Sequence, residues 1–139
     1  MDHIDEKVLR ILQEDGRISM TKLGQMVNLS TPAVTERVRK LESAGVIEAY
    51  RAIVNPEKLN RKVTAFILFE TKKMLVFQQV CQQSPIVVEC HRVTGQYCYL
   101  VKIMAESIHE VESFIDEVSE YSVSTTLVNF SSPVKFKAI

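Results

Sequence analysis

The chain has 139 residues, of which 46% are apolar and 24% are charged, and its 17 basic and 17 acidic residues give a formal net charge of zero. No apolar run approaches the roughly 18 residues that a membrane-spanning helix needs, and the acidic, amphipathic start MDHIDEKVLR does not resemble a signal peptide. These features exclude a membrane protein and favour a cytoplasmic protein with one domain or two small ones.

The first third of the chain predicts three short helices. Asp2 can cap the first helix and Gly16 ends it, while Ser19 can cap the second. Asn28 is one of the few non-glycine residues that tolerate a positive φ, so we expect a tight turn there. The apolar residues that recur at helical spacing are Ile4, Val8, Ile11 and Leu12, then Met20, Leu23, Met26 and Val27, then Val34, Val38 and Leu41.

The third predicted helix has signals at both ends. Ser30 or Thr31 can cap its start, and Pro32 fits the first turn because its missing N–H would be unbonded there. The helix is expected to run to Ala44, and Gly45 follows where a left-handed cap residue belongs.

The second and third helices have the spacing of a helix-turn-helix motif. We expect Gly24 to lie where the two helices cross most closely, because a side chain there would separate them. A plain helical hairpin is the alternative, since it would also use an apolar stripe and a turn residue.

The outer face of the third helix favours DNA over that alternative. It has short hydroxyl side chains near its start and cations further along, and basic residues outnumber acidic ones seven to three between Arg37 and Lys62. For Arg37 two roles stay open: a phosphate contact, or packing of its stem on the core with pairing to an acid. The predicted DNA-binding residues are Ser30, Thr31, Pro32, Thr35, Glu36, Arg37, Arg39 and Lys40.

The segment VIEAYRAIVNP after Gly45 has β-branched and aromatic residues, which predicts a wing or a connecting strand. PEKLNRK then predicts a short helical turn that stops at Asn60. We therefore place the boundary near residue 60, with a winged helix-turn-helix domain over 1–60 and a second domain over 61–139.

The second domain is predicted to be α+β. Residues 63–70, 86–93, 97–104 and 123–130 have strand composition, and apolar residues recur at helical spacing over 74–81 and 108–118. The resulting order βαββαβ is that of a ferredoxin-like fold, which we predict for this domain.

The predicted strands also have two apolar faces, whereas two helices can cover only one face of such a sheet. On 63–70, Ala65, Ile67 and Phe69 alternate with Phe66 and Leu68, and on 97–104 Tyr97, Tyr99, Val101 and Ile103 alternate with Cys98, Leu100 and Met104. A second buried face implies a partner sheet, so we predict a homodimer.

Several motifs in order resemble the leucine-responsive regulatory protein (Lrp/AsnC) family: IDEKVLRILQEDGRIS, LSTPAVTERVRKLESAGVI, VNPEKL and VTGQYCYLVK. The resemblance covers essentially the whole chain. It implies a cytoplasmic, nucleoid-associated transcription regulator that binds double-stranded DNA, dimerises through its sheets and assembles further into octamers. It implies no cofactor, and an amino acid as the candidate effector.

The resemblance places that effector near the turn between the second and third strands. On the residues alone, Gly95 is either a tight-turn glycine or a point where the backbone is open to a small molecule. The family commonly has Asp where this chain has Cys98, so an amine contact to that carboxylate is not carried over. The candidate effector-binding residues are Thr94, Gly95, Gln96, Tyr97 and Cys98.

The residues favour other functions less. An enzyme using Cys90 and His91 is disfavoured, because neighbouring residues of a strand point to opposite faces. The three cysteines, Cys81, Cys90 and Cys98, form no CxxC motif and have no histidine at metal-ligand spacing, so we expect reduced, mostly buried thiols and no metal site. The remaining alternatives are an effector-independent DNA-organising protein and an assembly or ligand-binding module without DNA affinity.

Overall fold

A computed structural model describes residues 1–139 and divides them into two compact units. Met1–Ile53 form the first unit together with Val134–Ile139, and Val54–Pro133 form the second. The division therefore lies before the predicted boundary near residue 60, and the last residues of the chain group with the N-terminal unit. Residue pattern alone does not indicate on which unit a short irregular segment packs.

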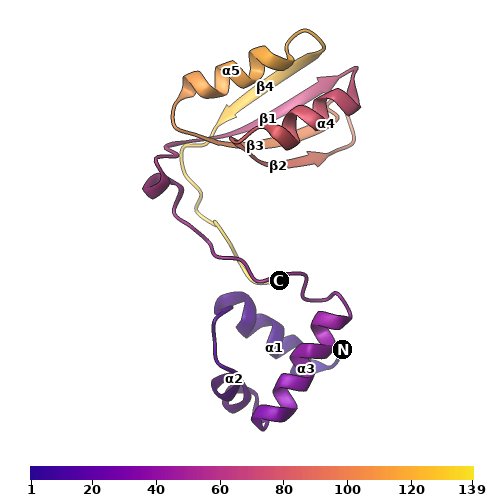
Figure 1. The fold of residues 1–139 in the computed structure, drawn as a ribbon, viewed down its shortest axis with the longest axis vertical. Helices are drawn as coiled ribbons and strands as arrows, with labels where there is room; N and C mark the ends of the chain where they lie inside the picture. Colours follow the sequence, from indigo (N-terminus) through magenta and orange to yellow (C-terminus); the bar gives the residue numbers. More distant parts are fainter. The chain divides into compact units, whose positions relative to one another are not determined.

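The N-terminal unit consists of α1 (His3–Glu14), α2 (Met20–Val27) and α3 (Thr31–Ser43) (Figure 1). Each helix has the predicted side-chain cap at its start, from Asp2, Ser19 and Ser30. The three amphipathic faces bury a common core, whose residues are Val8, Leu12, Ile18, Leu23, Val27, Val34, Val38 and Leu41.

The turn between α2 and α3 has the predicted backbone. Asn28 lies in the left-handed region with φ 56°, and Leu29 N donates to the carbonyl of Gly24 at 2.8 Å. A Cβ atom on Gly24 would lie 2.7 Å from the Leu29 carbonyl oxygen and 3.3 Å from Val34. Gly24 thus allows the backbone after α2 to pass against α2 itself, which confirms the predicted reason for a glycine.

The strand predicted over VIEAYRAIVNP does not form in this chain. Residues 48–55 have neither helical nor strand structure, and Ile53 and Val54 are exposed. β-branched composition favours extended backbone, but a strand needs a hydrogen-bonded neighbour, and this segment pairs with none. Tyr50 instead donates its hydroxyl to Glu42 of α3 at 2.9 Å. The predicted helical turn follows as η1 (Pro56–Leu59), and Asn60 ends it at φ 59°.

The C-terminal unit confirms the βαββαβ order. Its elements are β1 (Val63–Thr71), α4 (Met74–Gln83), β2 (Val87–Arg92), β3 (Tyr99–Ala105), α5 (Ile108–Val118) and β4 (Ser122–Val128). The strands pair antiparallel in the order β2-β3-β1-β4, so the first strand lies inside the sheet and β2 and β4 form its edges.

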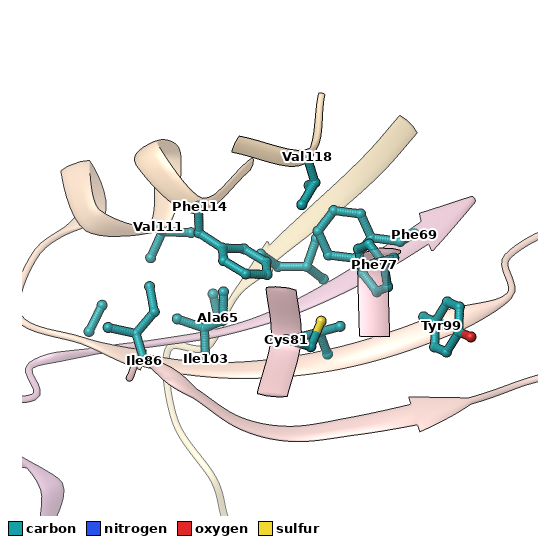
Figure 2. Close-up of a cluster of buried hydrophobic side chains, with 13 residues drawn as sticks. Ala65, Phe69, Phe77, Cys81, Ile86, Tyr99, Ile103, Val111, Phe114 and Val118 are labelled. Atoms are coloured by element: carbon teal, nitrogen blue, oxygen red, sulfur yellow. The ribbon is translucent and has the colours of Figure 1, made fainter. Parts of the chain in front are cut away.

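Both helices lie on one face of the sheet (Figure 1), and the space between them is filled by apolar side chains (Figure 2). Phe77 of α4 packs between Phe69 and Tyr99, with ring centroids 4.8 Å and 5.0 Å apart. Burial of such rings supplies much of the stability of a small core. The remaining core residues are Ala65, Ile67, Cys81, Ile86, Val101, Ile103, Ala105, Val111, Phe114 and Val118.

One part of the predicted third strand is wrong. β3 begins at Tyr99, so Tyr97 and Cys98 do not continue its alternation. Cys98 N donates to Phe69 O at 2.9 Å, and its sulfur lies 3.3 Å from Thr71 N. These contacts with β1 turn the chain before the strand begins, and composition does not predict them.

We expect Gly24→Ala to destabilise the N-terminal unit by about 1–3 kcal/mol, the usual cost of overpacking. The gain in helix propensity is about 1 kcal/mol, but the contacted atom is a backbone oxygen that cannot move aside alone. Urea unfolding followed by circular dichroism measures the change. Gly16→Ala is the matched control, because its Cβ would have only ordinary contacts at 3.7 Å and 3.8 Å. Equal stability of both variants would contradict the close approach.

Candidate nucleic-acid interface

The outer face of α3 carries most of the predicted DNA-binding residues. Ser30 caps the helix by accepting a hydrogen bond from Ala33 N at 3.4 Å. Val34, Val38 and Leu41 are buried on the inner face, so the opposite side of α3 faces solvent. The exposed predicted residues are Ser30, Thr31, Pro32, Thr35, Glu36, Arg39 and Lys40.

The first two turns of this face present hydroxyl and methyl groups. Thr35 is exposed and donates its hydroxyl to the carbonyl oxygen of Thr31 at 2.7 Å, so its hydroxyl oxygen remains an acceptor. Thr31 lies 3.5 Å from the hydroxyl of Thr21 on α2. Such short groups suit base edges in a major groove, where hydrogen-bond donors and thymine methyl groups are presented.

The charged part of the face is internally paired. Arg39 donates from Nε and Nη2 to the two carboxylate oxygens of Glu36 at 2.9 Å and 2.8 Å, and Lys40 Nζ lies 4.0 Å from the same carboxylate. The Arg39 guanidinium holds the pKa of Glu36 below its ordinary value. All three side chains are exposed, and exposed pairs contribute little net stability, so Arg39 can leave Glu36 for a phosphate at small cost.

Arg37 pairs with acidic residues, which is the second of the two roles left open for it. Its Nη1 atom donates to Asp2 at 2.8 Å and to Asp5 at 2.7 Å, which joins α3 to the start of α1. The Arg37 side chain is half-buried and does not share the exposed face of Arg39 and Lys40. Asp2 and Asp5 were not predicted as the partners of Arg37, although Asp2 was predicted as the cap of the first helix.

The two carboxyl groups also bind each other's backbone. Asp2 accepts from Asp5 N, and Asp5 accepts from Asp2 N. This backbone hydrogen bond, and then Arg37, lowers the pKa of Asp2 from 3.8 to about 2. The corresponding backbone bond and Arg37 also lower the pKa of Asp5.

The candidate effector turn is exposed at its tip. Val93 N donates to Cys98 O at 3.0 Å and closes the turn, while Gly95 has φ 123° with open space where a side chain would be. Thr94, Gly95 and Gln96 are exposed. Gly95 therefore needs no ligand to explain it, because that backbone conformation already favours glycine.

The last two residues of the candidate effector set point to neighbouring strands. The hydroxyl of Tyr97 lies 2.9 Å from that of Thr125 on β4, and the sulfur of Cys98 lies 3.4 Å from Phe69 O. None of the five lines the cavity of about 390 Å³ that Gln78, Cys81 and Tyr99 help to form. The five residues are adjacent in the chain, but they lie outside this cavity.

The predicted separation of Cys90 from His91 is confirmed by the sheet register. Cys90 pairs with Val101, whose side chain is in the core, whereas His91 pairs with Leu100 on the other face. His91 and Lys102 both approach Glu89, at 3.2 Å and 2.8 Å. Cys90 and His91 thus lie on opposite faces of β2.

The sheet face opposite the helices is apolar at its centre. Lys102 crosses it toward Glu89, with Nζ 5.9 Å from the centroid of Phe66. The register places the following apolar residues on this open face: Phe66, Leu68, Leu100, Met104, Val123 and Leu127. Val123 and Leu127 are 70% and 51% exposed, which confirms the predicted second apolar face.

None of the five α-helices has the length and apolar character required to cross a membrane.

Two family profiles match this chain. One, described as winged helix-turn-helix DNA-binding, matches residues 1–48, and the other, described as the Lrp/AsnC ligand binding domain, matches residues 64–139. Together they account for both structural units.

Individual relatives match almost the whole chain. The HTH-type transcriptional regulator YezC of Bacillus subtilis is 47% identical over 132 residues, which are 95% of each chain. The structure of B. subtilis LrpC has a TM-score of 0.92 at 38% identity and covers 98% of this chain and 99% of its own. A Neisseria meningitidis transcriptional regulator solved as an L-methionine complex shares the fold, with a TM-score of 0.93 at 24% identity, covering 100% of this chain and 96% of its own.

We expect Arg37→Met to raise the pKa of Asp2 and Asp5 only part of the way toward their ordinary values, because the backbone hydrogen bonds remain. The folded-state pKa values are lowered, so the pairing stabilises the fold above the ordinary carboxyl pKa and is lost as pH falls from 3.8 through about 2. NMR titration of the carboxyl groups measures the shift. Lys40→Met, which removes a cation from the same helix, should leave both values unchanged; equal shifts would contradict the assignment to Arg37.

Proposed function

The chain belongs to the Lrp/AsnC family of DNA-binding transcriptional regulators, and we propose that the exposed face of α3 is the surface through which it recognises DNA. The observation that carries the proposal is the separation of the helix into two sides. The inner side is fully used by the core, and Arg37 is used by α1, which leaves hydroxyl groups and two cations directed to solvent.

We propose different roles for the two ends of this face. Thr31 and Thr35 are near the start of α3, where a recognition helix contacts base edges. Ser30, Arg39 and Lys40 contact phosphates, Arg39 by exchanging the Glu36 carboxylate for a phosphate oxygen. Pro32 sets the first turn of the helix, and Glu36 holds Arg39 until DNA replaces it. Arg37 supports the helix from behind and does not contact DNA.

The two roles differ in their dependence on salt. Thr35→Ala should reduce the preference for a specific duplex over a scrambled one by about 1–3 kcal/mol with an unchanged salt slope. Arg39→Ala should weaken binding to both duplexes and reduce the magnitude of the salt slope by about 1, since one fewer counterion is released. Fluorescence anisotropy over a salt series, with DNA from upstream of the protein's own coding region, measures both quantities.

Lys72→Ala is the control for these variants, because Lys72 is an exposed cation between β1 and α4, outside the helix-turn-helix motif. Identical changes in preference and slope from Thr35→Ala and Arg39→Ala would contradict the division of roles. The absence of any duplex binding by the unmodified protein would contradict the proposal for α3 itself.

We also propose that the open sheet face joins two copies in a homodimer, and that dimers assemble further into octamers. The support is the apolar centre of this face, which a second copy would bury. A dimer presents two recognition helices, and paired helices address a symmetric DNA site.

Leu68→Glu should convert the dimer to a monomer, because it places a carboxylate at the centre of the open face beside Leu100. Sedimentation equilibrium measures the mass. Leu75→Glu is the matched control: Leu75 is also exposed, at 76%, but lies on α4, away from this face. Leu75→Glu should preserve the dimer even if it disturbs larger assemblies. A Leu68→Glu dimer would contradict the proposed interface.

For the effector, we propose that an amino acid is bound at the turn formed by Thr94, Gly95, Gln96, Tyr97 and Cys98. The support is the family description of this domain as ligand binding, together with the exposed tip of the turn. Because Thr94, Gly95 and Gln96 are exposed on one chain, a second chain would complete the site. A thermal-unfolding screen with single L-amino acids tests it; no response to any of them would favour an effector-independent, DNA-organising role.

We also propose that the regulator acts in the cytoplasm, at the nucleoid.

A further inference from the structure

Two cysteines that the DNA-binding function does not use line the same cavity. Cys81 is on the sheet-facing side of α4 and belongs to the core, as Figure 2 shows. Cys90 is on β2 and pairs with Val101 of that core, so it occupies the face of the sheet that α4 covers. Both line a cavity of about 390 Å³, which is walled on one side by the 2.6 Å hydrogen bond from Gln78 to the hydroxyl of Tyr99.

The two thiols differ in their access to solvent. Cys81 is 4% exposed, whereas Cys90 is an exposed residue of an edge strand. A reagent from solvent therefore reaches Cys90 first and finds Cys81 behind it. This is the arrangement expected for a reactive cysteine with a resolving partner.

The interaction between the thiols favours reaction at the exposed one. The neighbouring Cys81 thiol, and then the charge of His91, lower the pKa of Cys90 to about 7. The neighbouring Cys90, together with burial, raises the pKa of Cys81. Near neutral pH a substantial share of Cys90 is then thiolate, the nucleophilic form, while Cys81 keeps its proton.

We propose that Cys90 is a hydroperoxide-reactive thiol and that Cys81 resolves it into an intramolecular disulfide between β2 and α4. The Cys90 thiolate attacks one oxygen of hydrogen peroxide, the O–O bond breaks, and the departing hydroxide takes a proton to form water. The sulfur of Cys81 then attacks the Cys90 sulfenic acid as it loses its proton, the S–O bond breaks, and a second water leaves. Two thiols are oxidised by two electrons in total, and one peroxide is reduced to two waters.

The third cysteine provides an internal comparison. The sulfur of Cys98 is 3.3 Å from Thr71 N and 3.4 Å from Phe69 O, on the β1 side of the sheet. It does not line the cavity that Cys81 and Cys90 share. Cys98 should therefore take no part in the disulfide, although it is closer to Cys90 in sequence than Cys81 is.

The disulfide would hold an edge strand that leads directly into the candidate effector turn. β2 carries a bulge between Val87 and Glu89 and is paired on one side only, to β3. Its last residue, Arg92, is followed by the turn at 93–98. Oxidation would thus restrain the same segment whose position sets the geometry of that turn.

The test uses the full-length protein, hydrogen peroxide and mass spectrometry with peptide mapping. Unmodified protein and Cys98→Ser should each lose about 2 Da, the mass of two hydrogen atoms, and show a Cys81–Cys90 linked peptide that dithiothreitol removes. Cys90→Ser should form no linked peptide. Cys81→Ser should stop at a Cys90 sulfenic acid that dimedone labels.

Cys81 is buried, so circular dichroism must first show that Cys81→Ser is folded. If it is not, the Cys98→Ser and Cys90→Ser variants still decide whether the Cys81–Cys90 disulfide forms. The proposal fails if peroxide-treated Cys98→Ser contains no Cys81–Cys90 link. It also fails if the linked peptides of the unmodified protein join Cys98 to either partner, or join two chains.

Discussion

The passage of the chain against α2 at Gly24 determines where the candidate DNA-binding surface lies. With the Leu29 carbonyl 2.7 Å from the place of a missing Cβ atom, α3 begins directly beside α2, and Asn28 provides the left-handed turn that allows it. Two contacts then fix the rotation of α3: its apolar stripe enters the core, and Arg37 binds the start of α1. The exposed face consists of the α3 residues that take part in neither contact.

The sheet imposes a comparable constraint on the C-terminal unit. Two helices cover the centre of one face, so that Ile67, Val101 and Ile103 are inaccessible to solvent. The alternate residues of the same strands have apolar side chains and no helix to cover them. In a monomer, Leu68 and Leu100 on the open face would not stabilise the fold, because no element covers them. Dimer formation and the pairing of recognition helices are therefore proposed from one feature of the strands.

Local signals predicted most of this architecture. Caps at Asp2, Ser19 and Ser30, the left-handed residue Asn28, the stop at Asn60 and most of the periodic apolar residues depend on near neighbours, and these were confirmed. Met26 is an exception: it has the spacing of a core residue in α2 but is 46% exposed. The failures depended on distant partners. The segment around Ile53 had strand composition but no pairing partner, and Cys98 is turned by the backbone of β1. The role of Arg37 stayed open because its acids lie 32 and 35 residues away.

The zero net charge of the chain is compatible with DNA binding because its charges are paired in ways that DNA can exchange. The Arg39 pair with Glu36 is exposed, so water already solvates both groups, and replacing a carboxylate oxygen by a phosphate oxygen changes the partner without burying a new charge. Arg37 is different, because Asp2 and Asp5, which bind it, also cap α1. Removing Arg37 from these acids would loosen α1. Both arginines contribute equally to the net charge, whereas only Arg39 is available to a phosphate. The charge that matters for recognition is thus set by which ion pairs are structural and which are not.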